Sequence, residues 1–478
     1  MITFLIAFGS LIVGYFIYGR IIDGIFKPTD NPTPAMTKAD GVDYIPLPTW
    51  KVFLIQLLNI AGLGPIFGAL GGALWGPAVY FWIVLGTIFA GAVHDYLSGM
   101  ISLREGGKSI SEIVGMQLGD RMLSVMRVFT VVLLILVGAV FMTGPAMLLA
   151  KITGQQMLIW LAVIAIYYFL ATLLPIDTVI ARLYPIFGIC LIIMAFGIMF
   201  GMLFGVGGHV MPEMQLANLY PAADPLPIWP LMFITVACGA ISGFHSTQSP
   251  LMARCLKSER LARPVFYGAM VMEGMIALIW AAAGVTFYES TGGLAAAMAA
   301  GGPGGAVYEI CVGFMGSGIG ATLAMLGVVA CPISTGDTAL RASRLIISDW
   351  FKISQDTTHK RLNLAIPIIT IAVILTQIDF SIIWRYFSWL NQTLAMIILW
   401  TGTVYLYNMK PNSKSYFIAM IPAIFMSIVT FTYILQAKEG LQLPTMITYP
   451  SGLAFALFCL ILCFKTRMKH KMIDGHLN

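Results

Sequence analysis

The stretch NIAGLGPIFGALGGALWG, residues 59–76, decides the fold of this chain. It lies within an apolar segment long enough to cross a membrane, yet it holds six glycines and a proline. Irregular backbone at membrane depth is tolerated only where it is buried in protein or lines a water-filled cavity, because lipid cannot pair with its N–H and C=O groups. The stretch therefore indicates a binding site inside a membrane protein.

Close helix packing is the alternative explanation, since Gly68 and Gly72 have the GxxxG spacing of packed membrane helices. Packing explains Gly62 and Gly64 less well, because Pro65 follows directly. Proline removes a backbone donor and disfavours a helical conformation at the residue before it. We therefore predict that the helix breaks at this point.

The composition excludes a soluble globular protein. Of the 478 residues, 59% are hydrophobic and 10% are charged, against about 25% charged in an average soluble domain. Apolar segments of the length that spans a bilayer recur along the whole chain. We predict thirteen of them, at about 1–22, 51–74, 77–103, 123–150, 156–174, 184–206, 228–253, 264–288, 308–340, 361–377, 384–405, 415–435 and 448–464.

The placement of basic residues tests this count. With the N-terminus outside and the C-terminus cytoplasmic, 24 of the 27 Lys and Arg fall on the cytoplasmic side, and only Lys151, Arg385 and Lys438 do not. This asymmetry is the positive-inside pattern of multi-pass inner-membrane proteins. We expect the first segment to be retained as a helix in the lipid bilayer. The topology explains the net charge of +6 without a nucleic-acid partner.

A second apolar segment, 228–253, is also interrupted, by Gly239, Gly243 and Pro250 among others. Four further spans follow each interrupted segment, so the two five-helix sets have opposite orientations. This pattern points to an inverted-repeat transporter, whose broken helices hold substrate and ions. The predicted parts are an additional helix and cytoplasmic loop (1–50), the two repeats (51–206 and 228–405), and two C-terminal helices with a basic tail (415–478). Two outer loops without Lys or Arg, 209–227 and 290–308, are either lids or plain connectors.

Five blocks of sequence resemble, in order and spacing, the signature blocks of the carbon starvation protein A family. They are NIAGLGPIFG (59–68), GAVHDY (91–96), ITVACGAISGFHS (234–246), STGDTALRASRLIISDW (334–350) and WLNQTLA (389–395). The resemblance covers most of the chain from about 50 to 400. It implies an all-α polytopic membrane protein with a LeuT-type five-plus-five inverted repeat.

The resemblance also implies a function, namely secondary transport of small carboxylate-bearing nutrients, peptides or pyruvate, during carbon starvation, coupled to H⁺ or Na⁺. Longer members of the family insert extra spans that are absent here. After the shared SGFH, this chain reads STQSPLMARCL (246–256) where longer members have a Ser/Thr/Gly-rich run. That difference falls on the second broken helix, so the substrate stays open.

In a LeuT-type arrangement, the two broken helices face each other, and their half-helix N-termini favour an anionic group. We expect the substrate to lie against residues of both breaks. These are Asn59, Gly62, Gly64 and Pro65 on the first, and Ser242, Gly243, His245, Ser246 and the donor Gln248 on the second. We expect no Lys or Arg near these blocks. His245, within the break, is a candidate substrate or proton ligand, the alternative being a satisfied core histidine.

Two further groups are candidates for coupling and gating. His94 and Asp95 form an adjacent ionisable pair in an apolar span, and such groups are functional by default in membranes. We expect them near the cytoplasmic side, and the alternative is an interfacial pair bonded to cytoplasmic loops. Asn391 and Gln392 either gate the pathway or make ordinary interhelical hydrogen bonds.

A sodium site of the LeuT type would use the hydroxyls of Ser334 and Thr335 with the carbonyls of Ala61 and Gly64. Asp337 is an ion ligand, a proton site, or the partner of Arg341 four residues on. The sequence predicts no cofactor other than the coupling ion, and the oligomeric state has no readable signal.

Enzyme motifs are absent, since GxSxG, HExxH and GxxxxGK[ST] do not occur. We therefore predict that the protein is not an enzyme. Two rival functions stay open, a channel without coupled transport and a membrane sensor that binds nutrient without moving it.

Overall fold

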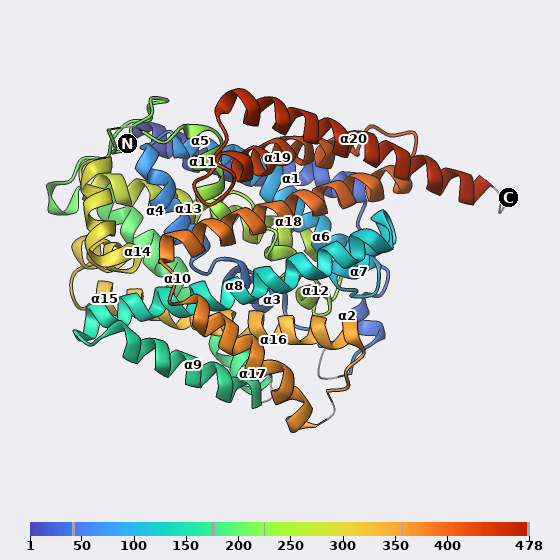
Figure 1. Cartoon of the computed structure of the whole chain (residues 1–478), viewed down its shortest axis with the longest axis horizontal. Coiled ribbons are helices and arrows are strands. Elements are labelled where there is room, and N and C mark those ends of the chain that lie inside the picture. The colour runs from blue at the N-terminus through green and yellow to red at the C-terminus, as the bar shows by residue number, and fades with distance from the viewer. Residues whose placement is uncertain (41–43, 174–176, 224, 356, 476–478) are drawn as a thin grey trace.

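The structure is a computed structural model that describes residues 1–40, 44–173, 177–223, 225–355 and 357–475. Helices make up nearly all of its regular structure (Figure 1). The α-helices are α1 (Ile2–Phe26), α2 (Pro34–Thr37), α3 (Thr49–Ile60), α4 (Ala69–Gly72), α5 (Val79–Gly86), α6 (Ala92–Arg104), α7 (Ile110–Leu118), α8 (Asp120–Thr153), α9 (Met157–Leu173), α10 (Asp177–Leu203), α11 (Ile228–Thr235), α12 (His245–Ala253), α13 (Gly268–Phe287), α14 (Thr291–Met315), α15 (Ile319–Ala324), α16 (Cys331–Phe351), α17 (Thr358–Leu375), α18 (Phe380–Met409), α19 (Phe417–Gln436) and α20 (Thr445–Gly475). Shorter 3₁₀ and π turns are η1 (Gly64–Gly68), η2 (Ala73–Trp75), η3 (Thr87–Gly91), η4 (Val206–Gly208), η5 (Ala237–Gly239), η6 (Glu259–Leu261), η7 (Arg263–Tyr267) and η8 (Met325–Ala330).

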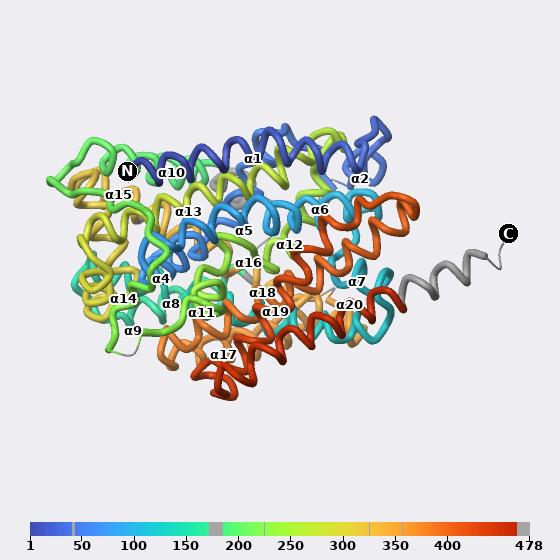
Figure 2. Tube along the Cα trace, turned by 90° about the horizontal axis from the view of Figure 1, so that it is seen from above, coloured from blue at the N-terminus to red at the C-terminus, as the bar shows by residue number. Residues whose placement is uncertain are grey.

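The long helices form one bundle whose members run mostly along its longest axis, as α8 and α18 do in Figure 1 and α1 does in Figure 2. Within the described residues, nine helical segments are long and apolar enough to cross a membrane, and ten if one bent pair counts as a span. The thirteen-span count stays a prediction. Large apolar side chains on the outer helices are exposed, among them Ile6, Leu158 and Leu453, as expected of surfaces that face lipid.

The first break is the bent pair. Helix α3 ends at Ile60, and the chain resumes in a π turn at Gly64 that runs through α4 to Trp75, at 53° to α3. Pro65 is the second residue of the new segment, where its missing N–H costs little because no carbonyl precedes it in the helix. The glycines and proline therefore end one half-helix and begin the next, as predicted.

The second break separates α11 from α12. Helix α11 ends at Thr235, a short 3₁₀ turn covers Ala237–Gly239, and α12 begins at His245. Both breaks are completely buried. The predicted interruption of this segment is therefore present.

The structure corrects the sequence prediction around residue 308. The predicted outer loop 290–308 is helical, because α14 begins at Thr291 and continues to Met315 with a kink at Gly302. The predicted span 308–340 does not match one helix, since the chain turns at Gly316 and a new helical segment runs from Ile319 to Phe351. The alanines of LAAAMAA favour helix strongly enough to outweigh the glycines beside them.

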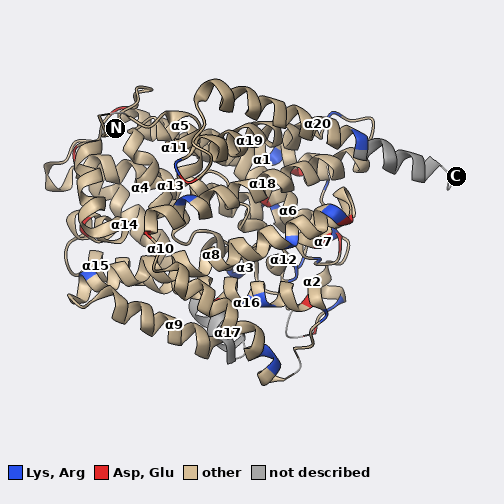
Figure 3. Ribbon diagram, in the orientation of Figure 1, with Lys and Arg blue, Asp and Glu red and all other residues tan. Residues whose placement is uncertain are grey.

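Basic residues gather at one end of the bundle (Figure 3). Lys38 donates to the carbonyl of Gly106 and Arg254 to that of Gly107, and Arg104 pairs with Glu259 at 3.1 Å. We call this region the basic end. It lies beyond α3 and α12, the half-helices on one side of the two breaks, while α4 and α11 extend from the breaks in the opposite direction.

Candidate functional site

The two breaks pack directly against each other, as predicted for a pair of facing broken helices. Turns η1 and η5 are in contact. A Cβ on Gly64 would overlap the side chain of Cys238, and one on Gly68 would overlap the carbonyl of Val236. These glycines are therefore needed for the close approach of the two backbones. Gly62, which also belongs to the first break, lies against the ring of Phe141 in α8.

Two amides of α18 bind the polar groups that the second break exposes. The carboxamide oxygen of Asn391 accepts the backbone N–H of Phe244 at 2.7 Å and the hydroxyl of Ser242 at 3.1 Å. Gln392 donates to the carbonyl of Phe233, near the end of α11, at 2.8 Å. Of the two roles that the sequence left open, this geometry is that of interhelical hydrogen bonding. These hydrogen bonds fix the position of the second break relative to α18.

Four ionisable side chains meet beside the second break, and we call them the buried cluster: His94, Asp95, His245 and Glu273. All four are 0% exposed. The Nδ1 atoms of His94 and His245 lie 2.7 and 2.9 Å from the two carboxylate oxygens of Asp95. The Nε2 atom of His245 lies 3.3 Å from Oε2 of Glu273. Asp95 and His245 thus join α6 to α12, and Glu273 adds α13.

The cluster has two positive and two negative groups when fully charged. If Asp95 is ionised, its carboxylate only accepts hydrogen bonds, and each imidazole then donates an Nδ1–H to it. Among the described residues, Nε2 of His94, Nε2 of His245 and both carboxylate oxygens of Glu273 have no hydrogen-bond partner, so the 3.3 Å approach of His245 to Glu273 is an ion-pair contact. A buried site of this kind is costly unless its charges balance, so the number of protons it holds matters for the conformations available to the protein.

The structure changes the predicted grouping of these residues. His94 and Asp95 contact each other and the second broken helix, so the alternative of an interfacial pair bonded to cytoplasmic loops is wrong. Glu273 was missed, although it is a carboxylate within the apolar span 264–288. The rule that ionisable residues inside spans are functional by default would have found it.

The other predicted substrate residues also lie at the breaks. Ser246 donates to the carbonyl of Gly243 at 2.6 Å, and Gln248 donates to the hydroxyl of Thr247 at 2.9 Å. The full predicted set is buried, and none of its members lines the large pocket described below: Asn59, Gly62, Gly64, Pro65, Ser242, Gly243, His245, Ser246 and Gln248. The structure therefore has them together in a closed interior.

The predicted sodium ligands come from neighbouring elements. Ser334 and Thr335 both donate to the carbonyl of Cys331, at 2.7 and 3.1 Å, and α16 contacts α3 near the first break. Ala61 lies at the end of α3 and Gly64 at the start of η1, on the two sides of the first break. The sodium site stays a prediction. Asp337 lies 3.6 Å from Arg341, which is the ion-pair alternative of the three that the sequence left open.

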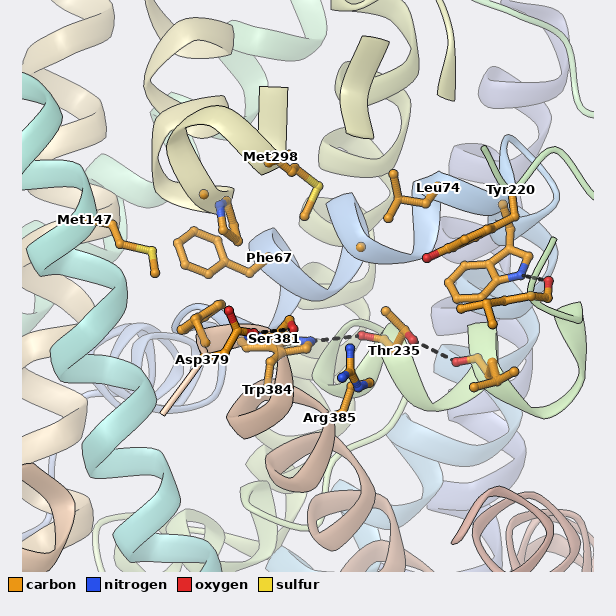
Figure 4. Close-up of a pocket in the computed structure, with 18 residues that line it drawn as sticks. Phe67, Leu74, Met147, Tyr220, Thr235, Met298, Asp379, Ser381, Trp384 and Arg385 are labelled. Carbon is orange, nitrogen blue, oxygen red and sulfur yellow. Dashed lines mark hydrogen bonds between the residues drawn. The ribbon is translucent and has the colours of Figure 1, made fainter. Parts of the chain in front are cut away.

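A pocket of about 560 Å³ (Figure 4) is lined by residues of α4 and α11, the half-helices on the side of the breaks away from the basic end. We call this side the pocket end. Its wall is formed by half-helices α4 and α11, the kink of α14 and the start of α18. Phe67 and Trp384 line the pocket with ring centroids 6.1 Å apart, and the indole of Trp384 donates to the carbonyl of Thr235.

Arg385 also lines this pocket, so the expectation that no Lys or Arg lies near the broken helices is wrong. Its Nε lies 3.0 Å from Oε2 of Glu439, and the other carboxylate oxygen, Oε1, accepts the hydroxyl of Tyr433. In the sequence, Arg385 is the second residue of the predicted span 384–405 and was counted on the outer side of the membrane. The start of α18 instead turns it toward the pocket.

A bundle of apolar helices in which two broken helices pack break to break, with ionisable residues buried beside one of them, is the architecture of a polytopic solute transporter. Mhp1, a nucleobase-cation-symport-1 family transporter solved in a closed conformation with bromovinylhydantoin bound, has this fold; its TM-score is 0.52 over 88% of this chain and 93% of that one, at 13% identity. The chain belongs to the family described as carbon starvation protein CstA, which matches residues 1–159, 144–291 and 281–433.

Relatives in this family differ in length and in name. An uncharacterized membrane protein of Haemophilus influenzae is 42% identical over 63% of this chain and 95% of its own length. The peptide transporter CstA of Bacillus subtilis is 28% identical over 57% of this chain and 56% of its own length. The pyruvate/proton symporter BtsT of Escherichia coli is 27% identical over 52% and 43%. The aligned part thus spans about half of these two named transporters.

Proposed function

We propose that this protein is a secondary active transporter that takes up small carboxylate-bearing nutrients, peptides or pyruvate, together with protons. The names of two relatives, a peptide transporter and a pyruvate/proton symporter, support this proposal. The basic end would face the cytoplasm of a bacterial cell and the pocket end the outside, by the positive-inside rule. Residues 51–206 and 228–405 would be the two repeats that move during alternating access.

The buried cluster is the observation that carries the proposal. His245 is the first residue of α12, so one member of the cluster sits at the second break itself. Its two ring nitrogens face carboxylates on two other helices, Asp95 and Glu273. Any movement of the half-helix α12 relative to α6 or α13 therefore changes the contacts of a group that can carry a proton.

The coupling follows from the cost of net charge in this interior. If the cluster loses a proton while it stays buried, its charges no longer balance, and an unpaired buried charge is strongly unfavourable. The closed arrangement is then favoured only in the protonated state. Release of the proton would favour an arrangement in which Glu273 or His245 reaches water, and this links proton movement to the position of α12.

The substrate would bind between the breaks. The half-helices Gly64–Trp75 and α12 both begin at a break, and the two breaks contact each other. Each such end stabilises an anion by about 0.3–1 kcal/mol. A carboxylate is therefore the group that we expect there, held by backbone N–H groups of both segments.

Uptake into proteoliposomes tests the proposal. Radiolabelled pyruvate and a labelled dipeptide would be offered under an inward proton gradient and, separately, an inward sodium gradient. We expect accumulation of at least one compound under the proton gradient alone. Accumulation under the sodium gradient alone would move the coupling site to Ser334 and Thr335. Saturable binding without flux would mean a sensor, and flux without accumulation would mean a channel.

A further inference from the structure

The pocket end holds two side chains of opposite charge that the transport cycle proposed above does not use. Arg385 and Asp379 both line the pocket, and both belong to the beginning of α18 (Figure 4). The remaining wall is largely aromatic and aliphatic, with Phe67, Trp75 and Trp384 among its members. A pocket of about 560 Å³ is in the range of small-molecule sites, which combine apolar walls with a few polar groups.

Arg385 has unused hydrogen-bonding capacity. Its Nε lies within ion-pair distance of Glu439, and among the described residues neither Nη group makes a hydrogen bond. The side chain is 33% exposed, while Glu439 behind it is 5% exposed. Glu439 thus contacts the guanidinium at Nε, and the two Nη groups are left for a ligand in the pocket. Two parallel N–H groups in a plane are the geometry that binds a carboxylate.

Asp379 supplies the opposite charge. One of its oxygens, Oδ1, accepts the backbone N–H of Ser381 at 2.9 Å and the Ser381 hydroxyl at 2.5 Å. These hydrogen bonds lower the pKa of Asp379, so its carboxylate is ionised at neutral pH. The bonds also orient the side chain by capping α18, and they leave the second oxygen available for an ammonium group.

We propose that this pocket is a recognition site for short zwitterionic solutes, in which Arg385 binds the carboxylate and Asp379 binds the ammonium group. Arg385 lies six positions after Asp379, a rise of about 9 Å along the helix axis at 1.5 Å per residue, and both side chains line the same pocket. An extended dipeptide spans about 7 Å at roughly 3.5 Å per residue, and hydrogen bonds of about 2.9 Å extend its reach at both ends. A free amino acid carries both charges on one carbon and spans much less.

The site therefore selects by length as well as by charge. A dipeptide or tripeptide engages both side chains, with its own side chains against Phe67 and Trp384. Pyruvate has a carboxylate but no ammonium group, so it engages Arg385 alone. The inference rests on the proposed function only for the step that follows, in which the solute moves from this pocket to the breaks.

Equilibrium binding to the purified full chain tests the site without requiring flux. The probes are labelled Ala–Ala, its N-acetyl derivative, which lacks the ammonium group, and its C-terminal amide, which lacks the carboxylate. The variants are Asp379→Asn and Arg385→Gln, with Arg260→Gln, an exposed arginine paired to Asp30 at the basic end, as the matched control. Asparagine caps helices as well as aspartate does, so Asp379→Asn keeps the start of α18.

We expect each variant to weaken Ala–Ala at least about tenfold, as loss of a charged hydrogen bond would. Asp379→Asn should leave the N-acetyl derivative unaffected, and Arg385→Gln should leave the amide unaffected, since each ligand already lacks the group concerned. If Arg385→Gln does not fold because Glu439 is left unpaired, the double variant Arg385→Gln/Glu439→Gln removes both charges and answers the same question.

Equal losses for all three ligands, or no loss for Ala–Ala, would overturn the inference. Uptake in proteoliposomes separates this failure from failure of the proposed function. Wild-type uptake that neither variant alters would sink the pocket site and leave transport standing. The expected binding pattern without any flux would leave the pocket site standing and sink transport.

Discussion

The two sides of the breaks hold their charges in opposite environments. In the buried cluster, His245 lies between two carboxylates with no exposed surface at all. In the pocket, Arg385 is one-third exposed and has a single carboxylate behind it. Charges sealed from water respond to the gain or loss of a proton, while charges at an open cavity are free to bind a solute. We therefore propose that proton coupling takes place on one side of the breaks and solute recognition on the other.

The largest effect on uptake is expected when His245 is replaced. His245→Ala removes the one group that lies between Asp95 and Glu273, and leaves two buried carboxylates without their shared partner. Removing one partner of a buried charge pair costs about 3–5 kcal/mol, so we expect uptake to be abolished while folded protein remains in the membrane. Initial uptake rates in proteoliposomes measure this. His359→Ala alters an exposed histidine of α17 and serves as the control; uptake at the wild-type rate in His245→Ala would refute the assignment.

Glu273→Gln separates proton coupling from transport itself. The change keeps the size of the side chain but removes its charge. We therefore expect proton-driven accumulation of substrate to fall at least tenfold, while exchange of substrate across the membrane continues. Counterflow and gradient-driven uptake measured on the same vesicles distinguish the two. The control is Glu309→Gln, a carboxylate on α14 that pairs with Lys151 and is 40% exposed. If both variants lose accumulation equally, Glu273 has no special role.

Asn391→Ala tests whether α18 holds the second break in place. The change leaves the N–H of Phe244 without its acceptor, and an unsatisfied buried donor costs about 1–3 kcal/mol. We expect a lower thermal unfolding midpoint of the purified protein and slower uptake. The neighbouring Thr393→Ala, whose hydroxyl bonds within its own helix, should change neither. An unchanged midpoint for Asn391→Ala would show that the break does not depend on this bond.

The smallest effect is expected at the exposed pair of Arg260 and Asp30. Arg260 lowers the pKa of Asp30, so the pair stabilises the folded state above the ordinary pKa of an aspartate and loses that effect as the pH falls below it. Both side chains are largely in water, where ion pairs contribute little. Thermal unfolding of Arg260→Gln at pH 7 should match the wild type within error. A clear loss of stability would mean that the basic end matters more than its exposure indicates.

Local sequence was sufficient for the breaks and insufficient for what surrounds them. Gly62, Gly64 and Pro65 all disfavour the continuation of a helix, so the first break was predictable from four consecutive residues, 62–65. The hydrogen bonds of Asn391 to Ser242 and Phe244 join positions about 150 residues apart, and no local pattern encodes such a pairing. The sequence identified Asn391 as polar within a span but left its role open.

The buried cluster shows the same limit. His94, Asp95 and His245 were each singled out, but in two separate roles, because spacing along the chain does not show that α6 and α12 are neighbours. Glu273 was overlooked although it was visible as a lone carboxylate in an apolar segment. Arg385 was counted on the outer side because it lies at the edge of its span, where a shift of one turn decides which way a side chain points.

Proton-driven uptake tests the central claim most directly. Labelled pyruvate and labelled dipeptide are offered to proteoliposomes that contain the wild-type protein or Glu273→Gln, under an imposed proton gradient with sodium absent. We expect the wild type to accumulate at least one compound and the variant only to equilibrate it. Accumulation by Glu273→Gln at the wild-type level, or accumulation by the wild type that requires sodium and ignores the proton gradient, would contradict the account.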